Sequence, residues 1–196
     1  MPDTSMEALS KLRSAFIKDG TVTAGNASSL NDGGSALIMM NMEKAKKMGV
    51  RPIARVIASA PGSIEPSIMG MGVVEAVRKA VQFAGMEQNQ IDYWEFNEAF
   101  AAQVLGVNSE FKIDLERLNG VGSGIALGHP VGATGARLMV TLINEMKQGA
   151  FGTVAPPYVL PAVRPMLLFW SLYRSFSIYP TFFHRCRIPH KSSSMG

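Results

Sequence analysis

Apolar side chains recur at two spacings along residues 1–154. Spacings of three and four residues predict helices with one apolar face. Runs of β-branched and aromatic residues predict buried strands. The expected helices cover residues 5–18, 35–48, 71–84, 97–105 and 133–147, and the expected strands cover residues 21–24, 53–60 and 91–96. Because strands alternate with helices, the pattern predicts an α/β layer architecture.

Glycine, proline and asparagine separate these elements. Asn31 to Gly34 supply the turn and N-cap residues that predict a helix start. Pro61-Gly62 ends a strand, so residues 61–70 are expected to form a loop. Six glycines lie between residues 119 and 135. We therefore expect a shaped loop there, with at most a short strand around Ile125.

The pattern changes after residue 154. Residues 155–196 carry no acidic residue and include six prolines, at 156, 157, 161, 165, 180 and 189. Prolines at this density predict neither a regular helix nor a central strand, because proline lacks a backbone N–H. Two interpretations stay open for this tail: an ending unrelated to the rest of the chain, or a segment that binds a membrane surface or a partner through its arginines and aromatic residues.

The composition is that of a globular protein, with 47% hydrophobic and 17% charged residues. The net charge of +4 would suit an anionic partner, such as nucleic acid or the phosphates of coenzyme A. Much of the excess lies in the tail, so we interpret it as ordinary basic surface and expect no nucleic-acid partner. The one cysteine, Cys186, excludes an internal disulfide and a cysteine-rich metal site.

Targeting signals are not evident in the sequence. The start lacks the charged and apolar regions of a secretory signal, and no stretch reaches the roughly 18 apolar residues that a membrane span needs. The final Ser-Met-Gly differs from the peroxisomal Ser-Lys-Leu signal. We expect a cytoplasmic protein without a membrane span, and a mitochondrial location is also compatible.

Two short motifs carry the candidate chemistry. They are Asn97-Glu98-Ala99-Phe100 and the glycine-rich stretch from Gly128 to Gly135, which contains His129. A helix is expected directly after His129, so its imidazole would lie near the positive end of a helix dipole. An imidazole and an amide brought together there could form an oxyanion hole. The alternatives are a turn histidine with one backbone hydrogen bond, and an asparagine that caps the following helix.

With these motifs the chain resembles the thiolase family. Residues 2–35 resemble the end of the family's N-terminal domain, Ser67 to Gly72 resemble its P-x-x-M-G-x-G segment, and the resemblance continues to residue 154. It implies a thiolase-like layered α/β fold, in which the C-terminal half is joined to the last strand and helix of the N-terminal half. The implied boundaries are the end of the N-terminal domain at 1–50, an incomplete C-terminal domain at 51–154 and an unrelated proline-rich tail at 155–196.

The resemblance also implies an activity. Thiolases of the acetyl-CoA acetyltransferase type form or cleave acetoacetyl-CoA through an acyl-cysteine intermediate. The substrate is a coenzyme A thioester, acetyl-CoA or 3-ketoacyl-CoA, no metal or redox cofactor is used, and the intact enzymes are homo-oligomers. A degradative 3-ketoacyl-CoA thiolase of β-oxidation is the enzymatic alternative.

Four residues match functional positions of the family. His129 matches the histidine that lowers the pKa of the nucleophilic cysteine and helps to stabilise the thioester oxyanion. Asn97 matches the asparagine that holds an oxyanion-hole water, so we expect the two side chains within about 6 Å of each other, around one shared water. Ser28 matches the serine that binds the pantetheine arm of coenzyme A, or else caps its own loop. Gly128 would line the same coenzyme A site or set its shape.

The sequence also departs from the family. The family's nucleophilic cysteine lies in the half that would precede Met1, and its second cysteine belongs to a C-x-G-G-G motif just after residue 154. Here residues 155–159 read Ala-Pro-Pro-Tyr-Val. We therefore expect an inactive fragment, or a non-catalytic product that associates with a full-length thiolase. Loss of the partner half should leave the apolar faces of the helices at 71–84 and 133–147 partly uncovered.

Overall fold

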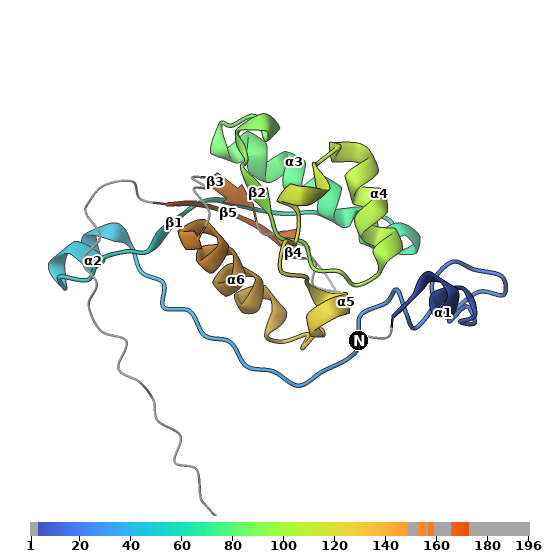
Figure 1. The fold of residues 1–196 in the computed structure, drawn as a ribbon. Coiled ribbons are helices and arrows are strands. Elements are labelled where there is room, and N and C mark those ends of the chain that lie inside the picture. Colours follow the sequence, from blue (N-terminus) through green and yellow to red (C-terminus); the bar gives the residue numbers. More distant parts are fainter. Residues whose placement is uncertain (1–3, 149–152, 156, 159–165, 173–196) are drawn as a thin grey trace, which may run out of the picture.

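The structure is a computed structural model that describes residues 4–148, 153–155, 157–158 and 166–172 (Figure 1). The α-helices are α1 (Met6–Ser10), α2 (Met42–Lys47), α3 (Gly72–Ala84), α4 (Ala101–Phe111), α5 (Gly124–Leu127) and α6 (Thr134–Gln148). The 3-10 helices are η1 (Pro66–Met71), η2 (Gln88–Gln90) and η3 (Leu115–Arg117). The strands are β1 (Ala54–Pro61), β2 (Tyr93–Trp94), β3 (Thr153–Ala155), β4 (Pro157–Tyr158) and β5 (Met166–Leu172).

The described strands form one mixed sheet in the order β1-β5-β3-β2, with β4 also paired to β5. β2 and β3 run parallel, while β5 is antiparallel to β1, β3 and β4. This order makes β5 a central strand, so the prediction that residues 155–196 hold no such strand was wrong. The reason is local: no proline occurs between Pro165 and Pro180, so every residue of β5 keeps its backbone N–H for pairing. Cys186 lies outside the described residues.

Two amphipathic helices cover the two faces of the sheet (Figure 1). α3 buries Val77 and Ala80 completely and ends at Gly85, which adopts the left-handed conformation typical of a helix C-cap. α6 buries Leu138 and Leu142 completely on its own side. The expected helices at these positions therefore form. The sheet buries the middle of each apolar face, while Val81 on α3 and Met139 and Ile143 on α6 are only partly buried, in line with the expectation that these faces would be partly uncovered.

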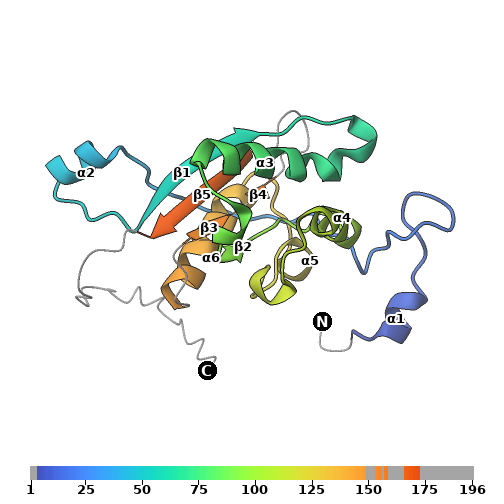
Figure 2. The ribbon, with the colours of Figure 1, turned by 90° about the horizontal axis from the view of Figure 1, so that it is seen from above.

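Strand β1 contributes to the core on both sides of the sheet. Ala60 packs in the cluster under α3, together with Trp94 and Phe96, whereas Ala54 and Val56 pack against the cluster around Leu142. Simple alternation would place these three residues of β1 on one face, and the register shift between Val56 and Ser59 turns Ala60 to the other side of the sheet. Figure 2, seen from above, shows α3 and α4 side by side, while α1 and α2 lie away from this body.

The N-terminal segment has less helix than its pattern predicts. The helix expected at 5–18 is limited to α1, the strand expected at 21–24 is reduced to a single bridge between Ser14 and Thr23, and α2 starts at Met42 with Asn41 as its N-cap. Ile38 is 91% exposed, so its apolar side chain has no layer to pack against. Short helices without such packing are marginal in water, which explains the extended backbone at 31–41.

Smaller differences occur around the loops. The loop expected at 61–70 contains η1, the strand expected at 91–96 is limited to β2, and α4 extends past its expected end to Phe111. The short strand expected around Ile125 is instead the helical turn α5. Among residues 4–148, no helix combines the length and the apolar composition that a membrane crossing requires.

Candidate functional site

Asn97 follows β2 in a short extended segment that is fixed by hydrogen bonds from the 119–125 loop. The side chain of Asn119 accepts from the backbone N–H of Phe96 at 2.6 Å and donates to Glu98 Oε1 at 2.9 Å. Glu98 Oε2 in turn accepts from the backbone N–H of Ile125 at 3.1 Å. Glu98 therefore holds the loop, and does not serve as a first-turn acid of α4. The N-cap position of α4 is Phe100, so Asn97 is not a helix cap.

The backbone on either side of His129 is fixed by the 29–31 segment. The His129 N–H lies 3.1 Å from both the carbonyl oxygen of Ser29 and Oδ1 of Asn31. Gly128 has a φ of +90°, and a Cβ built there would approach Asn31 Oδ1 to 2.5 Å. A side chain at 128 would thus force strained backbone and a steric clash. Gly128 permits the close approach of two segments that lie far apart in the sequence.

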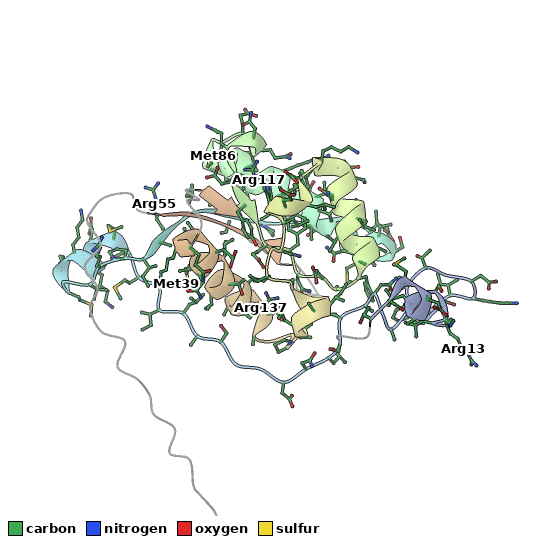
Figure 3. The ribbon with its side chains drawn as sticks, in the orientation of Figure 1. Arg13, Met39, Arg55, Met86, Arg117 and Arg137 are labelled. Atoms are coloured by element: carbon green, nitrogen blue, oxygen red, sulfur yellow. The ribbon has the colours of Figure 1, made fainter. Side chains whose placement is uncertain are left out.

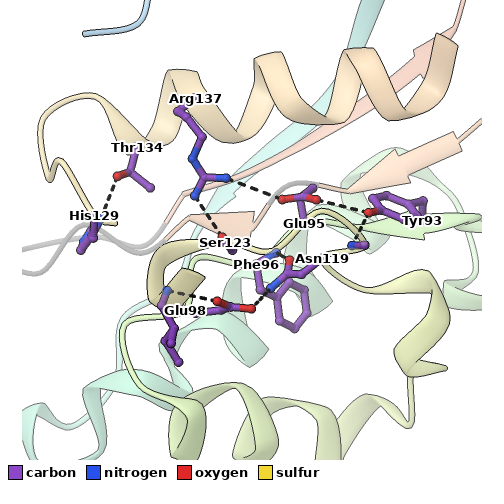
Figure 4. A network of polar contacts seen from close by, with 11 residues as sticks. Tyr93, Glu95, Phe96, Glu98, Asn119, Ser123, His129, Thr134 and Arg137 are labelled. Carbon is purple, nitrogen blue, oxygen red and sulfur yellow. Dashed lines mark hydrogen bonds and ion pairs between the residues drawn. The ribbon is translucent and has the colours of Figure 1, made fainter. Parts of the chain in front are cut away.

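A hydrogen-bond chain defines which imidazole nitrogen of His129 carries hydrogen. Nδ1 lies 2.7 Å from Oγ1 of Thr134, and that hydroxyl donates to the carbonyl of Pro130 at 3.0 Å. Because the hydroxyl proton is used in this way, Oγ1 accepts from Nδ1–H. In the neutral ring Nε2 then carries a lone pair. Figure 4 shows the His129–Thr134 contact at the start of α6.

Nε2 of His129 faces the side-chain amide of Asn97. The Asn97 Nδ2 atom lies 3.5 Å from it, and both residues are 6% exposed. Burial, and secondly the positive charge of Arg137, lower the pKa of His129 below its ordinary value. The imidazole is therefore neutral at neutral pH and can accept a proton at Nε2. The nearby start of α6 favours an anion that develops at the same point.

Asn97 and His129 form part of the wall of a cavity of about 470 Å³. The rest of the wall is mostly apolar, and it comes from Val22, η1, the start of α3 and the 99–103 segment. Met69, Met71 and Phe100 are among these lining residues. An apolar cavity with two convergent polar groups is the usual form of a small-molecule site.

Two of the predicted site residues lie beside this cavity but do not line it. Ser28 donates its backbone N–H to the carbonyl of Ala99 at 2.9 Å, and the neighbouring Ala27 bridges Phe100. Gly128 contacts Asn31, as described above. Neither residue is among those that line the cavity. Ser28 therefore anchors the wall through its backbone.

Sequence reasoning missed three residues that support the site, namely Thr134, Asn119 and Arg137. Thr134 lies within the glycine-rich motif and could have been singled out as a hydroxyl directly after the expected helix start. Asn119 has a φ of +51°, which asparagine tolerates better than most residues. Figure 3 labels Arg137 on α6, and Figure 4 shows its side chain directed toward Glu95 and Ser123. The position of Arg137 in the sequence, relative to His129, gives no sign that it supports the site.

Comparison with known proteins assigns the two parts of the chain to one family. Residues 1–43 match the thiolase N-terminal domain, and residues 50–156 match the thiolase C-terminal domain. The acetyl-CoA acetyltransferase of Pseudomonas aeruginosa is 52% identical over 143 residues, which are 73% of this chain and 36% of that protein. The Escherichia coli K12 acetyl-CoA acetyltransferase is 50% identical over 145 residues, which are 74% of this chain and 37% of that protein.

Solved structures show the same relationship in three dimensions. The Bacillus anthracis acetyl-CoA acetyltransferase superposes with a TM-score of 0.84 at 42% identity, over 88% of this chain and 44% of that one. Human mitochondrial 3-ketoacyl-CoA thiolase in complex with CoA superposes with a TM-score of 0.80 at 32% identity, with the same shares covered. The chain thus spans less than half the length of these relatives. Its fold and its sequence agree in the assignment, and the chain belongs to the thiolase family.

Proposed function

We propose that this chain carries the oxyanion-stabilising half of a thiolase-type acyltransferase site, of the kind that forms or cleaves acetoacetyl-CoA. The observation that carries the proposal is the 3.5 Å separation between Asn97 Nδ2 and His129 Nε2 in the wall of the cavity. An amide N–H and an imidazole at this separation converge on one small volume. A thioester oxygen, or a water that contacts it, can lie beside the pair at hydrogen-bond distance from both groups.

The chemistry requires a cysteine thiol, which a complete enzyme would supply from elsewhere. The lone pair on His129 Nε2 accepts the thiol proton, and the resulting thiolate attacks the thioester carbonyl carbon. The carbonyl π electrons move to oxygen. The new Nε2–H and the Asn97 N–H then donate toward that oxyanion, and the tetrahedral intermediate collapses by expelling the coenzyme A thiolate. Removing one donor of an oxyanion hole typically lowers turnover about 10²- to 10³-fold.

The same reasoning defines the substrate and the setting that we propose. The substrate is acetyl-CoA or a short 3-ketoacyl-CoA, and the mostly apolar wall suits its acyl group and the pantetheine arm. No metal or redox cofactor takes part in the proposed steps. We propose a homo-oligomeric, cytoplasmic enzyme, as the resemblance to the thiolase family implies.

By itself the chain should not turn over substrate. Its single cysteine, Cys186, cannot supply both the nucleophile and the second acid/base cysteine. Purified chain should therefore give background rates for acetoacetyl-CoA thiolysis and for acetyl-CoA condensation. Turnover that disappears in His129→Ala would contradict this part of the proposal, since it would mean that a complete site exists within the chain.

A binding experiment tests the oxyanion site without turnover. Acetoacetyl-CoA forms an enolate that absorbs in the near ultraviolet, and a pair of donors at the enolate oxygen should raise its amount. We expect the wild-type chain to increase this absorbance, and Asn97→Ala or His129→Ala to abolish the increase. Asn89→Ala removes an exposed amide outside the cavity and serves as the matched control. Equal absorbance in all four proteins would overturn the proposal.

Two alternatives each have an observation in their favour. The likeness to human mitochondrial 3-ketoacyl-CoA thiolase favours a degradative 3-ketoacyl-CoA thiolase, and a series of 3-ketoacyl-CoA esters in the same assay would reveal whether esters other than acetoacetyl-CoA bind more tightly. Exposed apolar residues in the first fifty positions, such as Phe16 at 73% and Ile38 at 91%, favour a non-catalytic product that associates with a full-length thiolase. Co-elution with a thiolase in size-exclusion chromatography would support that role.

A further inference from the structure

A carboxyl group that the proposed reaction does not use is buried next to the site. Glu95 follows β2 and is 0% exposed. Its Oε1 atom accepts a hydrogen bond from the hydroxyl of Tyr93 at 3.3 Å, a long contact. Its Oε2 atom has no hydrogen-bond partner within the part of the chain that the structure describes. A buried carboxylate normally needs fuller compensation for the water it has lost.

The charge that faces Glu95 comes from α6. Arg137 places Nη1 3.8 Å from Glu95 Oε2, which is close enough for an ion pair but too long for a hydrogen bond. Nη1 is buried and also lacks a hydrogen-bond partner among the described residues. The second nitrogen, Nη2, donates to Ser123 Oγ at 3.0 Å and so keeps the guanidinium in place. The two charged groups are therefore held facing each other across a gap.

Arg137 also connects this pair to the catalytic imidazole. Residues three apart on a helix lie on the same face, so Arg137 and Thr134 share one side of α6. Thr134 holds the Nδ1 atom of His129 at 2.7 Å. Figure 4 shows Thr134 and Arg137 descending from α6 toward His129 and Glu95 respectively. A positive charge at Arg137 opposes a second positive charge on the imidazole.

We propose that Glu95 is a positioning residue that acts on His129 through Arg137: a neutral Glu95 leaves the guanidinium charge uncompensated, and an ionised Glu95 cancels it. Uncompensated charge keeps the imidazole neutral and ready to accept a thiol proton. Cancelled charge stabilises the imidazolium. The catalytic meaning of this coupling rests on the proposed function, but the coupling itself is a property of this chain and is tested without substrate.

The groups around Glu95 determine the pH range in which its carboxyl group is neutral. Burial raises the pKa of Glu95 to about 8, and the charge of Arg137 and the hydrogen bond from Tyr93 oppose that shift. The other charged groups that act on Glu95 are Glu145 on α6 and Glu98, and both raise its pKa further. Glu95 is thus neutral below about pH 8, where Arg137 lowers the pKa of His129, and becomes ionised above that pH.

NMR titration of the imidazole nitrogens of the full chain tests the proposal. His129 is assigned by comparison with His129→Gln, since His184 and His190 are the only other histidines. We expect two inflections in the His129 shifts: its own protonation at low pH, and a smaller one near pH 8 that reports Glu95. Glu95→Gln should remove the inflection near pH 8. Arg137→Met should also remove it and should raise the pH at which His129 protonates.

Controls separate this coupling from folding and from the proposed function. Glu116→Gln removes an exposed carboxylate and should leave both inflections unchanged. If Arg137→Met fails to fold by circular dichroism, Glu95→Gln decides alone. An inflection near pH 8 that persists in Glu95→Gln, or that is missing from the wild type, overturns the proposal. If the coupling is observed while the acetoacetyl-CoA enolate signal is not, the proposed function fails and the Glu95–Arg137 coupling stands.

Discussion

The side-chain amide of Asn97 lies 3.5 Å from Nε2 of His129, although 32 residues separate the two in the chain. The sequence predicted a separation of no more than about 6 Å around a shared water, and the observed distance is within that bound. The Glu98 carboxylate ties the segment of Asn97 to the loop that precedes His129. The roles of the two residues in acyl transfer stay a proposal, and the following predictions concern the structure that holds them.

Thr134→Val should remove the acceptor that fixes the tautomer of His129. Thr134 is completely buried, and valine has nearly the same shape but no oxygen. The imidazole Nδ1–H and the carbonyl of Pro130 would both lose a partner, at a cost of about 1–3 kcal/mol of folding free energy. Chemical denaturation measures the loss, and imidazole nitrogen shifts should show a mixture of tautomers. Thr134→Ser keeps the hydroxyl and should retain the single tautomer.

Glu95→Gln should change how the stability depends on pH. The pKa of Glu95 rises from 4.5 to about 8 on folding, so the folded state favours its protonated form. The stability that this provides is complete below the unfolded pKa and is lost as the pH rises through the folded value. As the pH rises from about 5 to about 8, the free energy of unfolding of the variant should therefore rise relative to that of the wild type, by a few kcal/mol. Parallel stability–pH curves would contradict this prediction.

Gly128→Ala should destabilise the fold by about 1–3 kcal/mol, because φ is +90° and the new Cβ would meet Asn31 Oδ1. The backbone N–H of His129 should lose its contact with the 29–31 segment at the same time. Gly34→Ala is the matched control, since a Cβ there has open space and its φ is not positive. Thermal unfolding followed by circular dichroism compares the two. Gly→Ala at a compatible position lowers the entropy of the unfolded chain and is neutral or stabilising, so a control that loses as much as Gly128→Ala would show that the geometry at position 128 is not the cause.

Asn119→Gly should separate the side-chain contribution of Asn119 from its backbone conformation. Glycine tolerates the φ of +51° but removes the hydrogen bonds to Phe96 and Glu98. We expect the free energy of unfolding, measured by denaturant titration, to fall by about 1–3 kcal/mol. Lys112→Gly provides the comparison. Lys112 has a φ of +54° at the C-cap of α4, so glycine there should be neutral or stabilising. A neutral Asn119→Gly would mean that the loop is held by other contacts.

Deletion of residues 166–196 should abolish cooperative unfolding. β5 pairs with β1 from Ala54 to Pro61, so its removal leaves the backbone groups of a central region unpaired and exposes the sheet edge. We expect aggregation, measured by light scattering during purification. Deletion of residues 173–196 alone keeps β5 and should retain a cooperative transition. If the chain without residues 166–196 still unfolds cooperatively, β1 must be stable without β5.

The sequence by itself determined the helices α3 and α6, because their apolar residues recur at a spacing that any helix must bury on one side. It also determined the family, since the short motifs around Asn97 and His129 have the same residue types, in the same order, as the motifs of thiolases. These are properties of neighbouring residues. They can be read without knowledge of what lies across the molecule.

Only the tertiary structure decided which segments meet. Residues 31–41 stay extended because Ile38 finds no packing partner, and β5 is a central strand because β1 and β3 offer it backbone partners on both sides. The contacts of Asn97 with His129 and of Glu95 with Arg137 join elements that are far apart in the chain. Burial and charge compensation are set by all the surrounding elements at once, so local periodicity cannot reveal them.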